Sequence, residues 1–206
     1  MRPLVQIIDA GIGNINSVKN MFAKIGADIH VCTKPENIIT NERLILPGVG
    51  AFDEGCTALK AQGWLDILND EVMERKTPIL GICLGMQLLF EGSDEGIQSG
   101  LGWLKGNSRK FKFSKGSPFK IPHMGWNTVT IVNDNVLFPV DFEELRFYFL
   151  HSYHVDCKNK EDIIALTNHG SSVTAAVNRN NIYGVQFHPE KSHRFGYSIF
   201  QKFINL

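Results

Sequence analysis

The sequence predicts an α/β fold, with a mostly parallel central sheet flanked by helices and additional antiparallel strands in the second half of the chain. In the first half, short apolar runs alternate with segments whose apolar residues recur at helical spacing, which is typical of parallel strands covered on both faces. In the second half, strand-like runs follow one another with turn residues between them. No long linker interrupts the chain, so we expect a single domain over residues 1–206, whose character changes near residue 105.

The first half begins with an apolar run at residues 4–8 that ends at Asp9, and a glycine-rich turn follows it. Apolar side chains recur at helical spacing from Ile15 onward, and Gly26 is expected to end that helix. The Pro–Gly pair at 47–48 is expected to end a later strand. The further elements predicted before residue 105 are strands at 29–32, 43–46 and 78–82 and helices at 64–72 and 84–90.

The second half contains six strand-like runs and one closing helix at residues 198–204. The six runs are residues 110–113, 128–132, 147–151, 163–166, 173–177 and 182–187. Because turn residues separate them and helical patterns do not, these strands are expected to be the antiparallel part of the fold.

Composition and charge exclude several classes of protein. Lys plus Arg and Asp plus Glu both number 21, so the net charge is zero and a broadly basic nucleic-acid-binding surface is not expected. The longest apolar run, residues 77–90, is too short and too rich in glycine to span a membrane, and no secretory signal is visible. The four cysteines lie far apart without a CxxC pair, so we expect no disulfide framework, no metal site, and a reducing cytoplasm.

A cysteine with a glycine two residues away on each side marks the candidate active site. In GICLG, Cys83 lies between Gly81 and Gly85, where a predicted strand runs directly into a predicted helix. Such a corner needs a residue at positive φ and small neighbours, which is the pattern of a nucleophile elbow. At the start of a helix, Cys83 would be stabilised as a thiolate, and the Leu84 N–H could bind an oxyanion. The alternative is a buried core cysteine whose glycines only pack a helix against a strand.

A base for this cysteine is expected at the end of the last predicted strand. There His188 precedes Pro189, which biases it toward extended geometry, so His188 and Glu190 should point to the same side. Glu190 could then orient the imidazole while its other nitrogen faces the thiol. The alternative is a histidine at a strand end beside a solvated glutamate.

The segment PGVG at residues 47–50 also follows a predicted strand. It should lie at the carboxyl edge of the sheet, where ligands collect, and Gly50 is the best candidate there for a second oxyanion donor. A plain turn that ends a strand would show the same residues.

Taken together, PGVG at 47–50, GICLGMQ at 81–87 and HPE at 188–190 resemble the class I, or triad-type, glutamine amidotransferases. Further support comes from the opening IIDAGIGN, from PHMGWN at 122–127, from YFLHSY at 148–153 and from HPEKS, so the resemblance covers essentially the whole chain. It implies that Cys83 attacks the side-chain amide of L-glutamine, that Gly50 and Leu84 bind the oxyanion, and that His188, held by Glu190, moves the protons. No cofactor is implied.

The resemblance also implies residues that bind the substrate and a partner. Gln87, Glu95, His151 and Ser152 match positions around the amino-acid end of glutamine, and the carboxylate of Glu95 suits an α-ammonium group. No segment remains for a synthase, so ammonia should pass to a separate subunit. The leading candidate is a (β/α)8 barrel synthase of histidine biosynthesis, which would cover the carboxyl edge of the sheet. The expected interface residues are Asn14, Tyr148 and Lys191.

The sequence leaves three alternative functions open. HSYHVDC at 151–157 and NHGSS at 168–172 resemble paralogous amidotransferase subunits that supply ammonia to synthases modifying surface-polysaccharide sugars. A stand-alone cysteine hydrolase with the same elbow is a second alternative, and a catalytically silent regulatory subunit is a third. Gln87 and HPEKS disfavour the hydrolase, and the intact Cys-His-Glu set disfavours the silent subunit.

Overall fold

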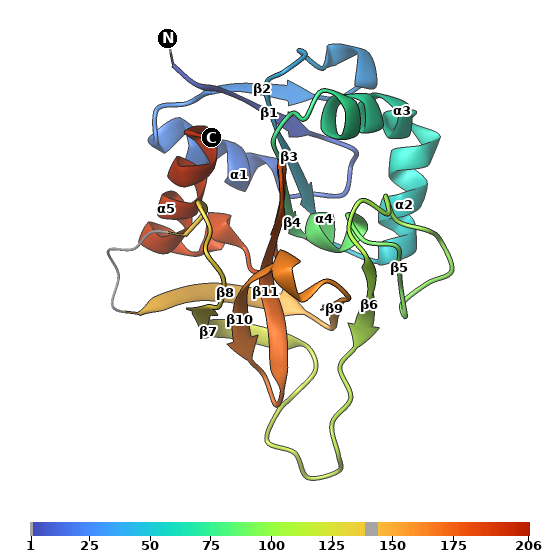
Figure 1. The fold of residues 1–206 in the computed structure, drawn as a ribbon, viewed down its shortest axis with the longest axis vertical. Coiled ribbons are helices and arrows are strands. Elements are labelled where there is room, and N and C mark those ends of the chain that lie inside the picture. Colours follow the sequence, from blue (N-terminus) through green and yellow to red (C-terminus); the bar gives the residue numbers. More distant parts are fainter. Residues whose placement is uncertain (1, 139–143) are drawn as a thin grey trace.

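The computed structural model describes residues 2–138 and 144–206, and its largest element is a nine-stranded sheet. The strands are β1 (Leu4–Ile8), β2 (Asp28–Cys32), β3 (Arg43–Gly48), β4 (Ile79–Cys83), β7 (His123–Ile131), β8 (Leu145–His151), β10 (Ile163–Asn168), β11 (Ser172–Arg179) and β12 (Ile182–Val185). They lie in the order β2-β1-β3-β4-β12-β11-β10-β7-β8 (Figure 1).

The sheet is mixed, and its two parts follow the two halves of the sequence. Strands β2, β1, β3, β4 and β12 pair in parallel. From β12 onward, β11, β10, β7 and β8 pair antiparallel. The α/β fold with additional antiparallel strands is therefore confirmed. Strand β12 belongs to the parallel part although it comes last in the chain, and this brings the C-terminal motif beside β4.

A second, three-stranded sheet lies beside the main one, in the order β5-β6-β9. Its strands are β5 (Gly92–Ser93), β6 (Gly106–Lys110) and β9 (Tyr153–Cys157). The predicted strand at 110–113 is wrong, because β6 ends at Lys110 and the buried side chain of Phe111 then packs against histidine rings. The sequence interpretation missed β9, which pairs with β6 far away in the sequence.

Helices cover both faces of the main sheet. They are α1 (Ile15–Lys24), α2 (Phe52–Ala61), α3 (Trp64–Asn69), α4 (Leu84–Leu88) and α5 (His193–Ile204), with 3-10 turns at Pro35–Asn37, Lys160–Asp162 and Pro189–Lys191. Figure 1 shows α1 and α5 on one side of the sheet and α2, α3 and α4 on the other. Among the described residues, no helix combines the length and apolar character needed to cross a membrane.

Local sequence explains several helix boundaries and fails at others. Helix α1 begins where the Asn14 side chain accepts a hydrogen bond from the Ser17 N–H at 3.3 Å, and Gly26 follows its end at φ +79°, as predicted. The predicted helix at 64–72 is α3 followed by a π-helical segment, Asp70–Glu74. Helix α2 was not predicted, α4 ends at Leu88 instead of residue 90, and α5 begins five residues before the predicted helix.

Two apolar cores pack against the sheet, one on each face. On one face, Phe22 of α1 packs against Phe200 of α5 with ring centroids 4.4 Å apart. On the other, Phe52 and Trp64 are fully buried among residues of α2, α3 and α4. Because helices cover both faces of the parallel strands, the carboxyl edge of these strands is left for a ligand site.

Candidate active site

The corner between β4 and α4 has the strained geometry of a nucleophile elbow. Cys83 adopts φ +53° and ψ −106°, a region that residues with a Cβ rarely occupy. A Cβ added at Gly81 would lie 2.7 Å from the carbonyl of Gly85, and one added at Gly85 would lie 1.8 Å from the Leu46 oxygen. The expected positive φ and the need for both glycines are therefore confirmed.

The glycine-rich segment at 47–50 lies directly beside this elbow. Strand β3 continues through Pro47 to Gly48, so the predicted end at residue 46 is wrong, and Gly48 is the register partner of Cys83. The Val49 N–H donates to the Ile12 carbonyl at 2.5 Å, which ties the segment to the first turn of the chain. Gly50 follows at φ +111° and lines the same cavity as Leu84. Both expected oxyanion donors thus belong to residues around the sulfur.

His188 and Glu190 form a buried pair in the same place. The His188 Nδ1 donates to the Glu190 Oε1 at 2.7 Å, and the two side chains are only 2% and 3% exposed. His188 has the extended backbone expected before Pro189, but Pro189 and Glu190 belong to a 3-10 turn. The expected alternation along an extended chain is therefore wrong, and the turn brings the two side chains together. Burial would lower the pKa of His188, but the neighbouring Cys83 sulfur and the Glu190 carboxylate outweigh it and raise that pKa to about 10. The imidazole is therefore a strong acceptor for a proton from the thiol.

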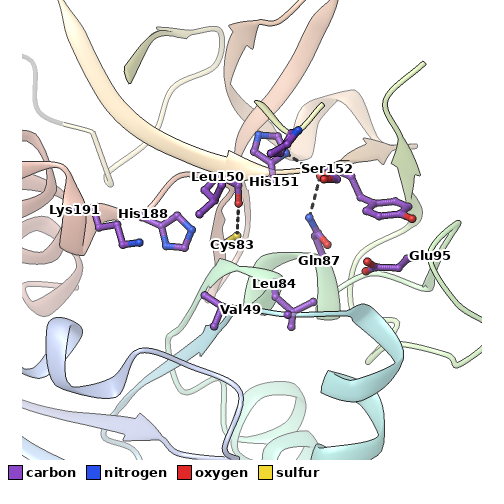
Figure 2. A pocket seen from close by; sticks show the side chains of 13 residues that line it. Val49, Cys83, Leu84, Gln87, Glu95, Leu150, His151, Ser152, His188 and Lys191 are labelled. Carbon is purple, nitrogen blue, oxygen red and sulfur yellow. Dashed lines mark hydrogen bonds between the residues drawn. The ribbon is translucent and has the colours of Figure 1, made fainter. Parts of the chain in front are cut away.

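These residues line a cavity of about 270 Å³ at the carboxyl edge of the sheet. Its lining residues are Val49, Gly50, Cys83, Leu84, Gln87, Glu95, Pro122, Leu150, His151, Ser152, Tyr153, His188 and Lys191. Figure 2 shows His188 and Gln87 on opposite sides of the Cys83 sulfur, with Glu95 beyond Gln87. The sulfur lies 3.8 Å from the Leu150 carbonyl of β8, which accepts its hydrogen bond.

The wall of the cavity opposite His188 is held by the Tyr153 carbonyl and by the hydrogen-bonded neutral histidines His123 and His151, which we call the histidine chain. Gln87 donates to the Tyr153 carbonyl at 3.0 Å, so its own carboxamide oxygen is the polar atom left to face a ligand. The His151 Nδ1 donates to the same carbonyl at 2.8 Å, and its Nε2 accepts from His123 at 2.9 Å. Burial lowers the pKa of His151 to about 3 and that of His123 to about 4. His151 and Ser152 thus line the cavity, but the His151 ring nitrogens are already engaged.

Glu95 reaches the cavity from a loop latched onto α2. Its Oε2 accepts from the Phe52 N–H at 2.8 Å, and Asp53 accepts from the Ile97 and Gln98 N–H groups at 3.0 and 2.9 Å. These contacts hold the loop against α2 at Glu95 and directly after it, and the remaining Glu95 oxygen is available to a cationic group.

The thiols outside the cavity have a different character. Cys32, Cys56 and Cys157 are buried, and burial raises the pKa of each to about 11. They are therefore protonated and poor nucleophiles at neutral pH. Within residues 2–138 and 144–206, no group of three or more His, Cys, Asp or Glu side chains is arranged to hold a metal ion.

Comparison with known proteins decides the family. The family model described as glutamine amidotransferase class-I matches residues 6–206. The chain belongs to the class I glutamine amidotransferases. A protein of Methanococcus maripaludis named imidazole glycerol phosphate synthase subunit HisH 2 is 52% identical over 201 residues, which are 98% of each chain. A protein of the same name from Pseudomonas aeruginosa is 44% identical over 203 residues, covering 98% of this amidotransferase and all of the relative.

Solved structures share the fold of this amidotransferase. A crystal structure titled glutamine amidotransferase superimposes with a TM-score of 0.75 at 17% identity, over 98% of this chain and 97% of that one. The structure of PurLQS from Thermotoga maritima gives a TM-score of 0.73 at 20% identity, over 100% and 99% of the two chains. Identities this low establish the fold alone.

Of the three residues expected at a partner interface, Lys191 lines the cavity, and Tyr148 and Asn14 belong to elements that contact its turn. Lys191 lies over the Tyr148 ring, with its Nζ 5.7 Å from the centroid. Asn14 caps α1, and α1 contacts the 3-10 turn that holds Lys191. The structure of this amidotransferase therefore groups the three on neighbouring elements, and their contact with a partner stays a prediction.

Two polar residues of the site were not singled out from the sequence. Gln186 lies two residues before His188, and its fully buried amide donates to the Cys83 sulfur at 3.7 Å. Alternation along an extended chain places Gln186 on the same side as His188, so this signal was present. Ser192 accepts from the Tyr148 N–H at 3.0 Å and donates to the His188 carbonyl at 2.6 Å. No local pattern in the sequence indicates that contact.

Proposed function

We propose that this amidotransferase is a glutaminase subunit that hydrolyses L-glutamine at Cys83 and passes ammonia to a separate synthase subunit. The observation that carries the proposal is the joint placement of the elbow cysteine and the buried His188–Glu190 pair in one cavity. A nucleophile, a base and a group that orients the base form a complete set for acyl transfer.

The proposed reaction begins when His188 takes the proton of the Cys83 thiol. The thiolate attacks the side-chain carbonyl carbon of glutamine, and the N–H groups of Gly50 and Leu84 stabilise the resulting oxyanion. His188 returns its proton to the amide nitrogen, so that ammonia leaves and a glutamyl thioester remains. His188 then takes a proton from water as the water attacks the thioester, which releases glutamate and restores the thiol.

The substrate's amino-acid end is proposed to lie on the opposite side of the sulfur from His188. The free oxygens of Glu95 and Gln87 would accept from the α-ammonium group, and His151 and Ser152, where β8 passes into β9, would line its pocket. This division leaves the side-chain amide of glutamine next to Cys83, as the chemistry requires.

The proposed acceptor is a (β/α)8 barrel synthase that forms a heterodimer with this chain and makes imidazole glycerol phosphate and AICAR in histidine biosynthesis. The names of the relatives from Methanococcus maripaludis and Pseudomonas aeruginosa support this acceptor. Ammonia released into water at neutral pH would mostly become ammonium, so the barrel should seal the cavity against Asn14, Tyr148 and Lys191. The free, buried cysteines suit the reducing cytoplasm proposed for this reaction.

A second candidate acceptor is a synthase that modifies a surface-polysaccharide sugar. The observation that favours it is the segment HSYHVDC at 151–157, which builds β9 and the histidine chain behind the cavity wall. The two candidates share the glutaminase chemistry and differ only in the protein that receives ammonia.

The test replaces Cys83 by alanine in complexes with each candidate synthase. Cys83→Ala should abolish glutamine-dependent synthesis and glutamate release, while synthesis from added ammonium continues. Cys56→Ala, at a buried cysteine outside the cavity, is the matched control and should keep both activities. Equal loss of glutamine-driven and ammonium-driven synthesis in a folded Cys83→Ala complex would contradict the proposal. Only the true acceptor should increase glutamate release from the unmodified chain.

A further inference from the structure

Gln186 is a fully buried polar side chain that the mechanism above does not use. It follows β12 directly, and its backbone N–H donates to the Ala175 carbonyl at 2.9 Å, so its position is fixed by the sheet. A buried amide is costly unless its donors and acceptor are engaged, so its partners indicate what it does.

The partners of Gln186 are the nucleophile on one side and the substrate wall on the other. Its Nε2 donates to the Cys83 Sγ at 3.7 Å, and its Oε1 accepts from the Gln87 Nε2 at 3.1 Å. Gln87 in turn donates to the Tyr153 carbonyl at 3.0 Å. Rotating the Gln186 amide by half a turn would set oxygen against sulfur and two amino groups against each other. The two glutamines therefore fix one orientation, in which an N–H points at the sulfur.

The two hydrogen bonds at the sulfur respond differently when the thiol loses its proton. As a thiol, Cys83 donates to the Leu150 carbonyl at 3.8 Å. As a thiolate it has nothing to donate, and the Leu150 oxygen then faces a negative charge. The bond from Gln186 survives the change and becomes charge-assisted, and such bonds are about twice as strong as neutral ones. Gln186 is thus a side-chain donor that favours the thiolate over the thiol.

We propose that Gln186 stabilises the Cys83 thiolate and links it to Gln87, so that contact of a ligand with Gln87 is transmitted to the nucleophile. The inference rests on the proposed function, since it assigns a partner to the same sulfur. It adds to the three triad residues a donor that acts before glutamine is attacked. Gln87 acts on the sulfur through Gln186, because its own amino group is engaged by the Gln186 oxygen.

The test measures the pH dependence of Cys83 alkylation by iodoacetamide in the full chain, with peptide mapping to follow this cysteine alone. Gln186→Met keeps the length of the side chain and removes the donor. The midpoint, which is the pH at which alkylation reaches half of its maximal rate, should therefore rise by about one pH unit, because the charged thiolate loses a hydrogen bond. Gln186→Glu keeps an acceptor for Gln87 but adds a like charge, so it should raise the midpoint further. Gln87→Met frees the Gln186 amide to rotate and should give a smaller rise.

Gln6→Met is the matched control. Gln6 is also fully buried, donates to two backbone carbonyls and accepts from the thiol of Cys32, but it lies on β1 away from the cavity. The Gln6→Met variant should lower the stability of the fold and leave the midpoint of Cys83 alkylation unchanged. Besides Cys83, the titratable groups lining the cavity are Glu95, His151, Tyr153, His188 and Lys191. All of these remain in every variant, and only Gln186→Glu adds a further titratable group.

The outcomes separate this inference from the proposed function. If Gln186→Met and Gln186→Glu keep the midpoint of the unmodified chain, Gln186 is only a packing residue and the inference is overturned. A Gln87→Met variant with an unchanged midpoint would overturn the link between the two glutamines. If either Gln186 variant fails to fold, the other one and Gln87→Met still decide. The assay needs neither glutamine nor a synthase, so a wrong acceptor or an absent glutaminase activity would leave these shifts in place.

Discussion

Replacing Cys83 by glycine should give a more stable fold than replacing it by alanine, although both variants lose the nucleophile. The residue lies at φ +53° and ψ −106°, where a Cβ costs about 1–3 kcal/mol and glycine pays nothing. Glycine also loses more backbone entropy on folding, which costs about 0.4–1 kcal/mol relative to alanine. Both variants lose the same thiol, so the difference isolates the backbone. The net advantage of glycine should be about 0.5–2 kcal/mol in the free energy of unfolding.

The measurement is denaturant unfolding of the two variants at neutral pH, supported by thermal melts. For a chain of this size, about 1 kcal/mol corresponds to a shift of roughly 2–4 °C. The matched pair is Cys56→Gly and Cys56→Ala, at a buried cysteine inside helix α2. There glycine should be less stable than alanine by about 1 kcal/mol. If glycine is less stable than alanine at Cys83 as well as at Cys56, the backbone of the elbow is not strained and the predicted advantage of glycine is wrong.

Three further outcomes are expected. A chloroketone that mimics glutamine should label Cys83 ahead of the other cysteines, as peptide mapping can show. His188→Asn should slow this labelling more than Glu190→Gln does, because losing the base matters more than losing its orientation. Equal labelling rates in the unmodified chain and the two variants would contradict this. The pKa values of His123 and His151 fall to about 4 and about 3 on folding, so the unfolded chain binds both protons more readily. The free energy of unfolding should therefore drop by several kcal/mol between pH 7 and pH 4, and a flat profile would exclude this. Lys191→Ala should weaken binding of the synthase, or uncouple glutamate release from formation of the synthase product, without affecting ammonium-driven synthesis. Normal binding together with a one-to-one ratio of glutamate to synthase product would place the interface elsewhere.

The parts of the site that the sequence predicted depend on neighbours close in the chain. The elbow was recognisable because Gly81 and Gly85 meet the crowding around Cys83 within two residues on either side. The extended backbone of His188 likewise followed from the proline directly after it. Local rules of this kind need no knowledge of which strand lies beside which, so they can be applied to a sequence alone.

The parts that were missed depend on contacts between distant segments. Strand β9 exists because it pairs with β6, about fifty residues earlier, and Phe111 leaves β6 to pack on His151 and His154. The histidine chain behind the cavity joins His123 to His151 across two strands. Helix α2 is different, because Phe52, Cys56 and Leu59 recur at helical spacing, so the sequence alone is sufficient to predict it.

The register of β12 decides whether the HPE motif can serve the elbow at all. Val185 pairs with Ile82, so the chain leaves β12 beside Cys83 with Gln186 and His188 on alternate positions, and Glu190 follows in the 3-10 turn. A slip by one residue would turn Phe187 toward the cavity and the polar residues into the core. Phe187 prevents this, because its fully buried ring stacks on Phe147 of β8 with centroids 3.9 Å apart. The apolar residue between the functional ones is therefore what keeps their side chains directed at the nucleophile, and this explains why an apolar core reaches to the edge of the site.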